Sequence, residues 1–131
     1  MNLENNITLN SIAPGKILKG EGAWEKGKHL IPQICQRPLI LGKSNKTSNI
    51  RNKIKNEIEG LGISSKSIVL NHGCCEEDLE RVQFISKDYE CDCIISTGGG
   101  KVLDAGKLIA DRLGIPCITI PLSAATCAGW T

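Results

Sequence analysis

Short apolar runs and longer amphipathic segments alternate along most of the chain. The apolar runs are rich in isoleucine, leucine and valine and are bounded by glycine, proline or polar residues, as buried strands usually are. The predicted strands are residues 39–41, SIVLNHG (67–73), CDCIIS (91–96) and IPCITIP (115–121).

Three amphipathic segments lie between these runs, and their apolar residues recur at the spacing of a helix. Thr47 or Ser48 is expected to cap the first helix, and Gly62 to end it. The predicted buried faces are Ile50, Ile54, Ile58 and Leu61 in residues 46–62, Leu79, Val82 and Ile85 in residues 74–89, and Leu103, Gly106, Ala110 and Leu113 in residues 101–114.

Apolar strands that alternate with helices are typical of a parallel sheet with helices on both faces. We therefore predict a three-layer α/β fold in one domain, since 131 residues suffice for one domain of ordinary size. Residues 1–37 are less regular and predict a short strand, a glycine-rich turn and one short helix.

Composition and charge exclude some functions. The net charge is +2 and the basic residues are scattered, which argues against a nucleic-acid surface. No apolar stretch approaches the roughly 20 residues of a membrane helix. The segment MNLENNITLN lacks the apolar centre of a signal peptide, so a cytoplasmic location is expected.

The chain has seven cysteines, and an odd number without a secretion signal indicates free thiols. Cys74, Cys75, Cys91 and Cys93 lie near His72 in the sequence, but their spacing is poor for zinc. Most of the cysteines are interpreted as small buried hydrophobic residues. A thiol or metal protein remains an alternative hypothesis.

Three consecutive glycines, Gly98, Gly99 and Gly100, follow the third predicted strand and are followed by Lys101. They lie where a parallel strand gives way to a helix, which is where open α/β sheets bind ligands. The helix start offers free N–H groups to a phosphate, glycine lets it approach the backbone, and Lys101 adds a positive charge. The motif matches neither the Walker pattern nor G-x-G-x-x-G, so it predicts only a phosphate-bearing ligand. The alternative is a tight turn without a ligand.

The motif Gly98-Gly99-Gly100-Lys101-x-x-Asp104, followed by Lys107 and IPCITIP, resembles that of the iron-containing (group III) alcohol dehydrogenases. The glycerol dehydrogenase branch is the most similar. APGKILKGEGAWE from residue 13 and LILGK are similar to other strands of that family, so the resemblance covers nearly the whole chain. Dehydroquinate synthases share the glycines but differ after them, and a fragment of such a lyase is an alternative.

The resemblance implies that residues 1–131 are a Rossmann-like, dehydroquinate synthase-like domain that binds NAD or NADP. The residues 98–100 and Lys101 would hold the pyrophosphate. Asp104 would lie near the cofactor or orient the loop, unless it is only an acidic residue of the first helical turn. The stretch from residue 121, with Leu122, Ser123 and Thr126, would lie along the adenosine and its ribose.

Two departures from the family pattern concern the cofactor. Leu122 stands where the family usually has a hydroxyl residue. NAD-preferring members often end the first nucleotide-binding strand with an Asp that binds the ribose 2′-OH, whereas this chain has Gly42-Lys43-Ser44. Lys43 would tolerate or favour a 2′-phosphate; the alternative is a solvated surface lysine.

The resemblance also implies a parent enzyme that moves hydride between NAD(P) and a small alcohol or polyol. Such members carry an all-helical carboxyl-terminal domain whose Asp and His residues bind a divalent metal, Zn or Fe. The chain stops at Thr131, and His29 and His72 fit no metal-ligand pattern. We therefore expect a truncated member that is inactive alone and associates as a homo-oligomer. A non-catalytic nucleotide-binding module acting with a partner is the other hypothesis.

Overall fold

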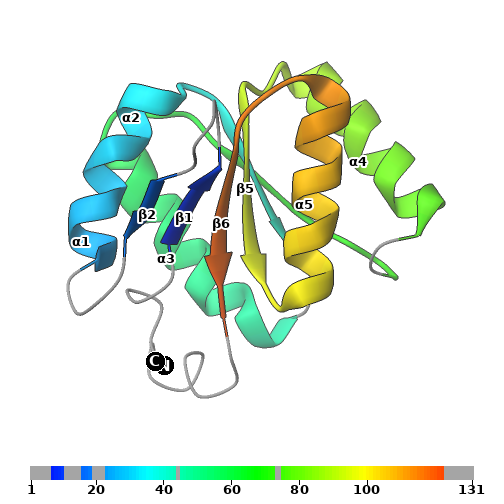
Figure 1. Cartoon of the computed structure of the whole chain (residues 1–131), viewed down its shortest axis with the longest axis horizontal. Helices are drawn as coiled ribbons and strands as arrows, with labels where there is room; N and C mark the ends of the chain where they lie inside the picture. Colours follow the sequence, from blue (N-terminus) through cyan, green and yellow to red (C-terminus); the bar gives the residue numbers. More distant parts are fainter. Residues whose placement is uncertain (1–6, 11–15, 19–22, 44, 73–74, 123–131) are drawn as a thin grey trace.

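A computed structural model describes residues 7–10, 16–18, 23–43, 45–72 and 75–122, which include six strands and helices on both sides of them (Figure 1). The strands are β1 (Ile7–Asn10), β2 (Lys16–Leu18), β3 (Pro38–Gly42), β4 (Lys66–Val69), β5 (Cys93–Gly98) and β6 (Cys117–Pro121). The helices are α1 (Ala23–Gly27), α2 (Ile31–Ile34), α3 (Ser48–Glu59), α4 (Glu76–Tyr89) and α5 (Gly100–Leu113), with short 3-10 turns η2 (Lys28–Leu30) and η3 (Asn45–Thr47).

The six strands form one sheet in the order β2-β1-β6-β5-β3-β4. Four of them, β6, β5, β3 and β4, are parallel, and helices connect them in the predicted order. The predicted α/β fold is therefore confirmed. The sheet is nevertheless mixed, because β1 and β2 add an antiparallel hairpin beside β6. The sequence pattern of residues 1–37 predicted one strand, whereas the structure has two there before β3, and β1 was not predicted.

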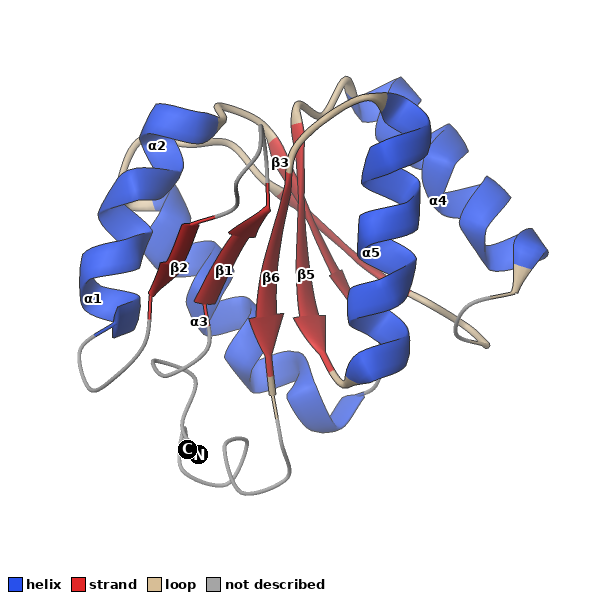
Figure 2. Ribbon diagram, in the orientation of Figure 1, coloured by secondary structure: helices blue, strands red, loops and turns tan. Residues whose placement is uncertain are grey.

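The helices form two layers, with α1, α2 and α3 on one face of the sheet and α4 and α5 on the other (Figure 2). Alternate residues of the central strands point to opposite faces. In β5, for example, Cys93 and Ile95 pack with the first layer, whereas Ile94 packs with the second. Both faces of β3 and β5 are fully buried, which explains why their sequences are apolar without a polar alternation.

Two details of the helices differ from the prediction. Leu103 and Leu113 are only half-buried, because the face of α5 that meets the sheet is centred on Val102, Ala105 and Ile109. The helix α3 ends at Glu59, and hydrogen-bonded turns then continue to Gly62, which has a φ of 91°. Gly106 and Ala110 are buried as predicted, whereas Leu61 and Ile85 are only half-buried. The predicted helices are therefore confirmed, although four of the predicted face residues are less buried than expected and the end of α3 was wrong.

Asp78, in the first turn of α4, binds the segment that connects β4 to this helix. Its side chain is buried and accepts a hydrogen bond of 2.5 Å from the backbone N–H of His72 and one of 3.2 Å from Arg81, which also donates to the carbonyl of Val69. Burial alone would raise the pKa of Asp78, but the backbone N–H groups of His72 and Asn71 and the Arg81 guanidinium lower it below its ordinary value.

We expect Asp78→Asn to reduce the free energy of unfolding by about 1–3 kcal/mol at pH 7, because it replaces a buried, hydrogen-bonded carboxylate. The pKa of Asp78 is lowered in the folded state, so its stabilisation is present above the unfolded pKa of about 3.9 and is lost as pH falls through the folded pKa. Urea denaturation from pH 7 down to pH 2 should show a constant difference above about pH 4, and the variant and the native protein should converge below it.

The exposed neighbour Glu77 in the same turn provides the control. Glu77→Gln should change stability by less than about 0.5 kcal/mol throughout. A constant difference between Asp78→Asn and native protein across this pH range would contradict the assigned role of the carboxylate.

Candidate functional site

The site lies at the edge of the sheet where the parallel strands β3, β5 and β6 end. Leu41 is paired with Ser96 in these strands, and Gly98 with Pro121, so their carboxyl ends lie close together. The helices α3 and α5 begin at this same edge, at the bottom of the view (Figure 1). Two helix starts and three strand ends therefore surround one region.

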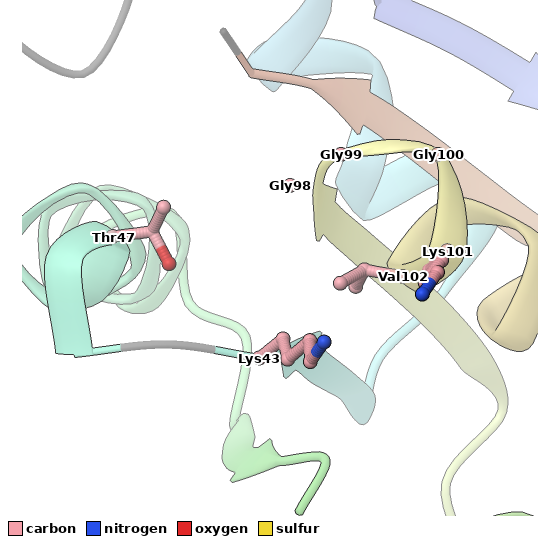
Figure 3. Close-up of a pocket in the computed structure, with 7 residues that line it drawn as sticks. All are labelled: Lys43, Thr47, Gly98, Gly99, Gly100, Lys101 and Val102. Atoms are coloured by element: carbon pink, nitrogen blue, oxygen red, sulfur yellow. The ribbon is translucent and has the colours of Figure 1, made fainter. Parts of the chain in front are cut away.

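A pocket of about 280 Å³ occupies this region. Thr47 lies on one side of it, the glycine turn and Lys101 lie on the other, and Lys43 lies between them (Figure 3). The lining residues are Lys43, Thr47, Gly98, Gly99, Gly100, Lys101 and Val102.

Gly98, the last residue of β5, has a conformation that other residues rarely adopt. Its φ is 140°, and a Cβ added to it would lie 3.3 Å from Cγ2 of Val102. The backbone turns here from the strand into α5, and the turn needs glycine for conformational reasons. The fold by itself therefore explains the first of the three glycines.

The fold does not explain the other two glycines. Gly99 has an extended backbone, with a φ of −82°, and Gly100 is the first residue of α5. A Cβ at either residue would meet no atom within 4 Å. Glycine costs roughly 0.5–1 kcal/mol relative to alanine, and no close contact or positive φ compensates for this at residues 99 and 100. Gly99 and Gly100 line the pocket, and the absence of side chains there leaves the space beside their backbone open.

The pocket presents hydrogen-bond donors and positive charge. The first N–H groups of α5 have no carbonyl one turn earlier, and Gly99 at the N-cap has no side chain to bind them. The helix dipole places a partial positive charge at the same point. Lys43 and Lys101 add two ammonium groups, and no Asp or Glu is among the residues that line this pocket. This arrangement suits an anion, and a phosphate above all.

Contacts behind the pocket hold the glycine turn in place. Gly106 lets α5 pack closely on β5, because a Cβ there would lie only 2.5 Å from Cβ and Oγ of Ser96. The hydroxyl of Ser96 donates a 2.6 Å hydrogen bond to the carbonyl of Val102. The N–H of Leu122 donates one of 2.9 Å to the carbonyl of Gly98. The turn is thus tied to its own helix and to the chain after β6.

The structure brings together five of the nine residues that the sequence suggested for the cofactor: Lys43, Gly98, Gly99, Gly100 and Lys101. Asp104 lies one turn further along α5, is exposed and does not line the pocket. The side chain of Leu122 packs against the core beneath α1 and α3. Ser123 and Thr126 lie outside the described residues.

Three residues at or beside the pocket were missed as site residues: Thr47, Val102 and Arg51. Thr47 stands at the N-cap of α3, as predicted, but makes no capping hydrogen bond; its hydroxyl accepts one from Nη1 of Arg51. The side chain of Arg51 is buried, with 3 % exposed. Burial lowers the pKa of Arg51, but a guanidinium with an ordinary pKa above 12 remains charged at neutral pH.

The cysteines in the described part of the chain are free thiols, and Cys35, Cys93 and Cys117 are buried, as predicted. Burial raises the pKa of Cys117 to about 12, so this thiol is protonated at neutral pH. The described residues contain no group of three or more His, Cys, Asp or Glu side chains that could hold a metal ion. They also contain no helix that is long and apolar enough to cross a membrane.

Four parallel strands of a sheet between two helical layers, with a glycine turn at their carboxyl ends, define a Rossmann-like α/β protein. Residues 14–131 match the model of the family described as iron-containing alcohol dehydrogenase. The chain belongs to this family, as the glycine motif suggested.

Individual relatives agree with the family. The chain is 38 % identical over 117 residues to glycerol-1-phosphate dehydrogenase [NAD(P)+] of Methanothrix thermoacetophila, a match that covers 85 % of this chain and 32 % of the relative. It is 26 % identical over 115 residues to glycerol dehydrogenase of Escherichia coli, covering 87 % and 31 %. The chain thus spans about a third of the length of these relatives.

The fold also matches solved structures. The crystal structure of glycerol dehydrogenase from Schizosaccharomyces pombe superposes with a TM-score of 0.67 at 25 % identity. The match covers 76 % of this chain and 25 % of that one. The sequence and structural matches therefore identify the same family.

Proposed function

We propose that this chain binds the pyrophosphate of NAD or NADP at the glycine turn, as part of an alcohol or polyol dehydrogenase. The proposal rests mainly on Gly99 and Gly100. A side chain would fit at either residue without touching the protein, so the fold does not require glycine there. The N–H groups of residues 99–101 and the ammonium group of Lys101 would hold the phosphate oxygens. The printed names of the relatives support the class of substrate and cofactor, because they include glycerol dehydrogenases and an enzyme described with NAD(P)+.

The other predicted cofactor residues have roles that depend on this placement. Lys43, across the pocket from the turn, would lie beside the ribose or its phosphate. Leu122 fixes the carbonyl of Gly98 through its N–H, and Ser123 and Thr126 would continue along the adenosine side. Asp104 would act from outside the pocket.

The residues of the pocket fit a dinucleotide, whereas the described residues offer no ligand set for a metal. When bound, the nicotinamide would supply the hydride chemistry. The chain's own contribution would be to bind and orient the pyrophosphate.

Calorimetric titration of the full protein with NADH and with NADPH tests the proposal. We expect at least one of them to bind with a Kd below 1 mM, which corresponds to about −4 kcal/mol. If neither binds at millimolar concentration, the proposed function is wrong.

Lys101→Ala should weaken NAD(P)H binding by roughly tenfold, about 1.4 kcal/mol, because it removes one charge beside the pyrophosphate. The effect should shrink as salt is raised, since the side chain is exposed. Lys107→Ala is the matched control, because Lys107 is also exposed on α5 but does not line the pocket. Equal losses in both variants would show that Lys101 acts only through the overall charge.

A further inference from the structure

Arg51 lies directly behind the wall of the pocket that Lys43 and Thr47 form. Its side chain fills the space that a side chain at Gly42 would need, because a Cβ there would lie 2.5 Å from Nη1 and 2.7 Å from Nε of Arg51. On the other side, Nη1 donates a hydrogen bond to the hydroxyl of Thr47, which lines the pocket. The guanidinium therefore lies between the end of β3 and the start of α3.

The charge of Arg51 is not balanced within the described part of the chain. None of the ion pairs there involves Arg51, and α3 has no acidic residue in its first turn. Buried charges are normally paired with an opposite charge. A cation in the first turn of a helix is also unfavourable, because it faces the positive end of the helix dipole.

The surroundings of Arg51 add further positive charge. Lys43 is exposed and lines the pocket, and the amino end of α3 contributes its own partial charge. Thr47 carries the only side-chain oxygen among the residues that line the pocket, and the described acids lie elsewhere. A second anion, separate from the one at the glycine turn, would balance the guanidinium and the ammonium group together.

We propose that Arg51 and Lys43 make this corner of the pocket selective for the 2′-phosphate of NADP. The inference rests on the proposed binding of NAD(P) at the glycine turn. An acidic side chain at the end of the strand would bind the ribose hydroxyls and repel a phosphate, whereas a nearby arginine accommodates it. Here Gly42 has no side chain, and a planar guanidinium with several donors occupies that space.

The two residues have different parts in this proposal. Lys43 contacts the phosphate. Arg51 is a positioning residue, because it orients the Thr47 hydroxyl and supplies charge from behind the pocket wall. A purely structural Arg51 would affect all nucleotides equally, so the ratio of affinities with and without the 2′-phosphate separates the two roles.

The test is calorimetric titration of the full protein with 2′,5′-ADP, 5′-AMP, NADPH and NADH. We expect the native protein to bind 2′,5′-ADP at least tenfold more tightly than 5′-AMP. Arg51→Met keeps an unbranched side chain but removes the charge, and should reduce this ratio by roughly 10-fold, because the 2′-phosphate loses a nearby buried positive charge and the group that orients Thr47. The affinity for 5′-AMP should change less than about twofold, and Arg51→Lys should restore part of the ratio.

Lys46→Met is the matched control, because Lys46 is exposed in η3, in the same segment, and does not line the pocket. It should leave the ratio unchanged. If Arg51→Met does not fold, Thr47→Val removes the partner of the guanidinium and should also lower the ratio. A native protein that binds 5′-AMP as tightly as 2′,5′-ADP overturns the inference but leaves NAD(P) binding intact. Failure to bind either NADH or NADPH overturns the proposed function itself, and this inference with it.

Discussion

Gly99→Val should abolish detectable binding of NADH and NADPH while the protein remains folded. The backbone at Gly99 is extended, so valine can adopt it, and the added Cβ meets no atom of the protein. The side chain would instead stand in the open space beside the pocket, where the phosphate oxygens are proposed to lie. A pyrophosphate could then no longer approach the N–H groups at the start of α5.

The measurement is calorimetric titration at millimolar cofactor, with the circular dichroism spectrum and thermal midpoint recorded in parallel. Gly60→Val is the control, because Gly60 also has a negative φ, meets only ordinary contacts at 3.4 Å and lies at the far end of α3. It should bind cofactor as the native protein does. If Gly99→Val also binds as tightly as the native protein, the glycines are only a tight turn and the phosphate role is wrong.

Gly106→Ala should destabilise the protein by about 1–3 kcal/mol, even though alanine favours a helix. At an exposed helical site the same change would stabilise by about 0.8–1.0 kcal/mol. Here the new Cβ would lie 2.5 Å from Cβ and Oγ of Ser96 in β5, so helix and strand must separate. The separation would also move Val102, whose carbonyl accepts the hydrogen bond from Ser96, and with it the glycine turn.

Gly100→Ala provides the comparison within the same helix. Gly100 begins α5, and its Cβ would meet no atom within 4 Å, so alanine there should leave stability unchanged or slightly increased. Urea denaturation of both variants measures the difference. Equal stabilities would mean that the contact between α5 and β5 yields to a methyl group without cost.

The sequence alone determined the layered α/β fold and the glycine turn. The strands β3 and β5 are buried on both faces, so most of their residues are apolar and the sequence predicts them as buried strands. The antiparallel strand β1 has only four residues, in a segment without a long apolar run, and its pairing with β6 joins residues more than one hundred positions apart. Such a pairing depends on the assembled sheet, and a local sequence pattern does not predict it.

The sequence also identified the side of the pocket that lies on consecutive residues, from Gly98 to Lys101, because a strand, a turn and a helix start follow one another there. It could not distinguish the three glycines. Only the tertiary structure shows that Gly98 is required by its positive φ, whereas Gly99 and Gly100 have open space around them.

On the opposite side of the pocket the sequence suggested only Lys43, and tertiary structure decided the rest. Thr47 and Arg51 lie at the start of α3, and Thr47 faces the glycine turn across the pocket only because β3 and β5 are adjacent in the sheet. In the sequence, Arg51 is one of several basic residues in an amphipathic helix and would be expected on the surface. Its burial follows from Gly42, whose missing side chain leaves room for the guanidinium nine residues later in the chain. Packing between separate segments, which a local pattern does not record, placed that arginine behind the pocket wall.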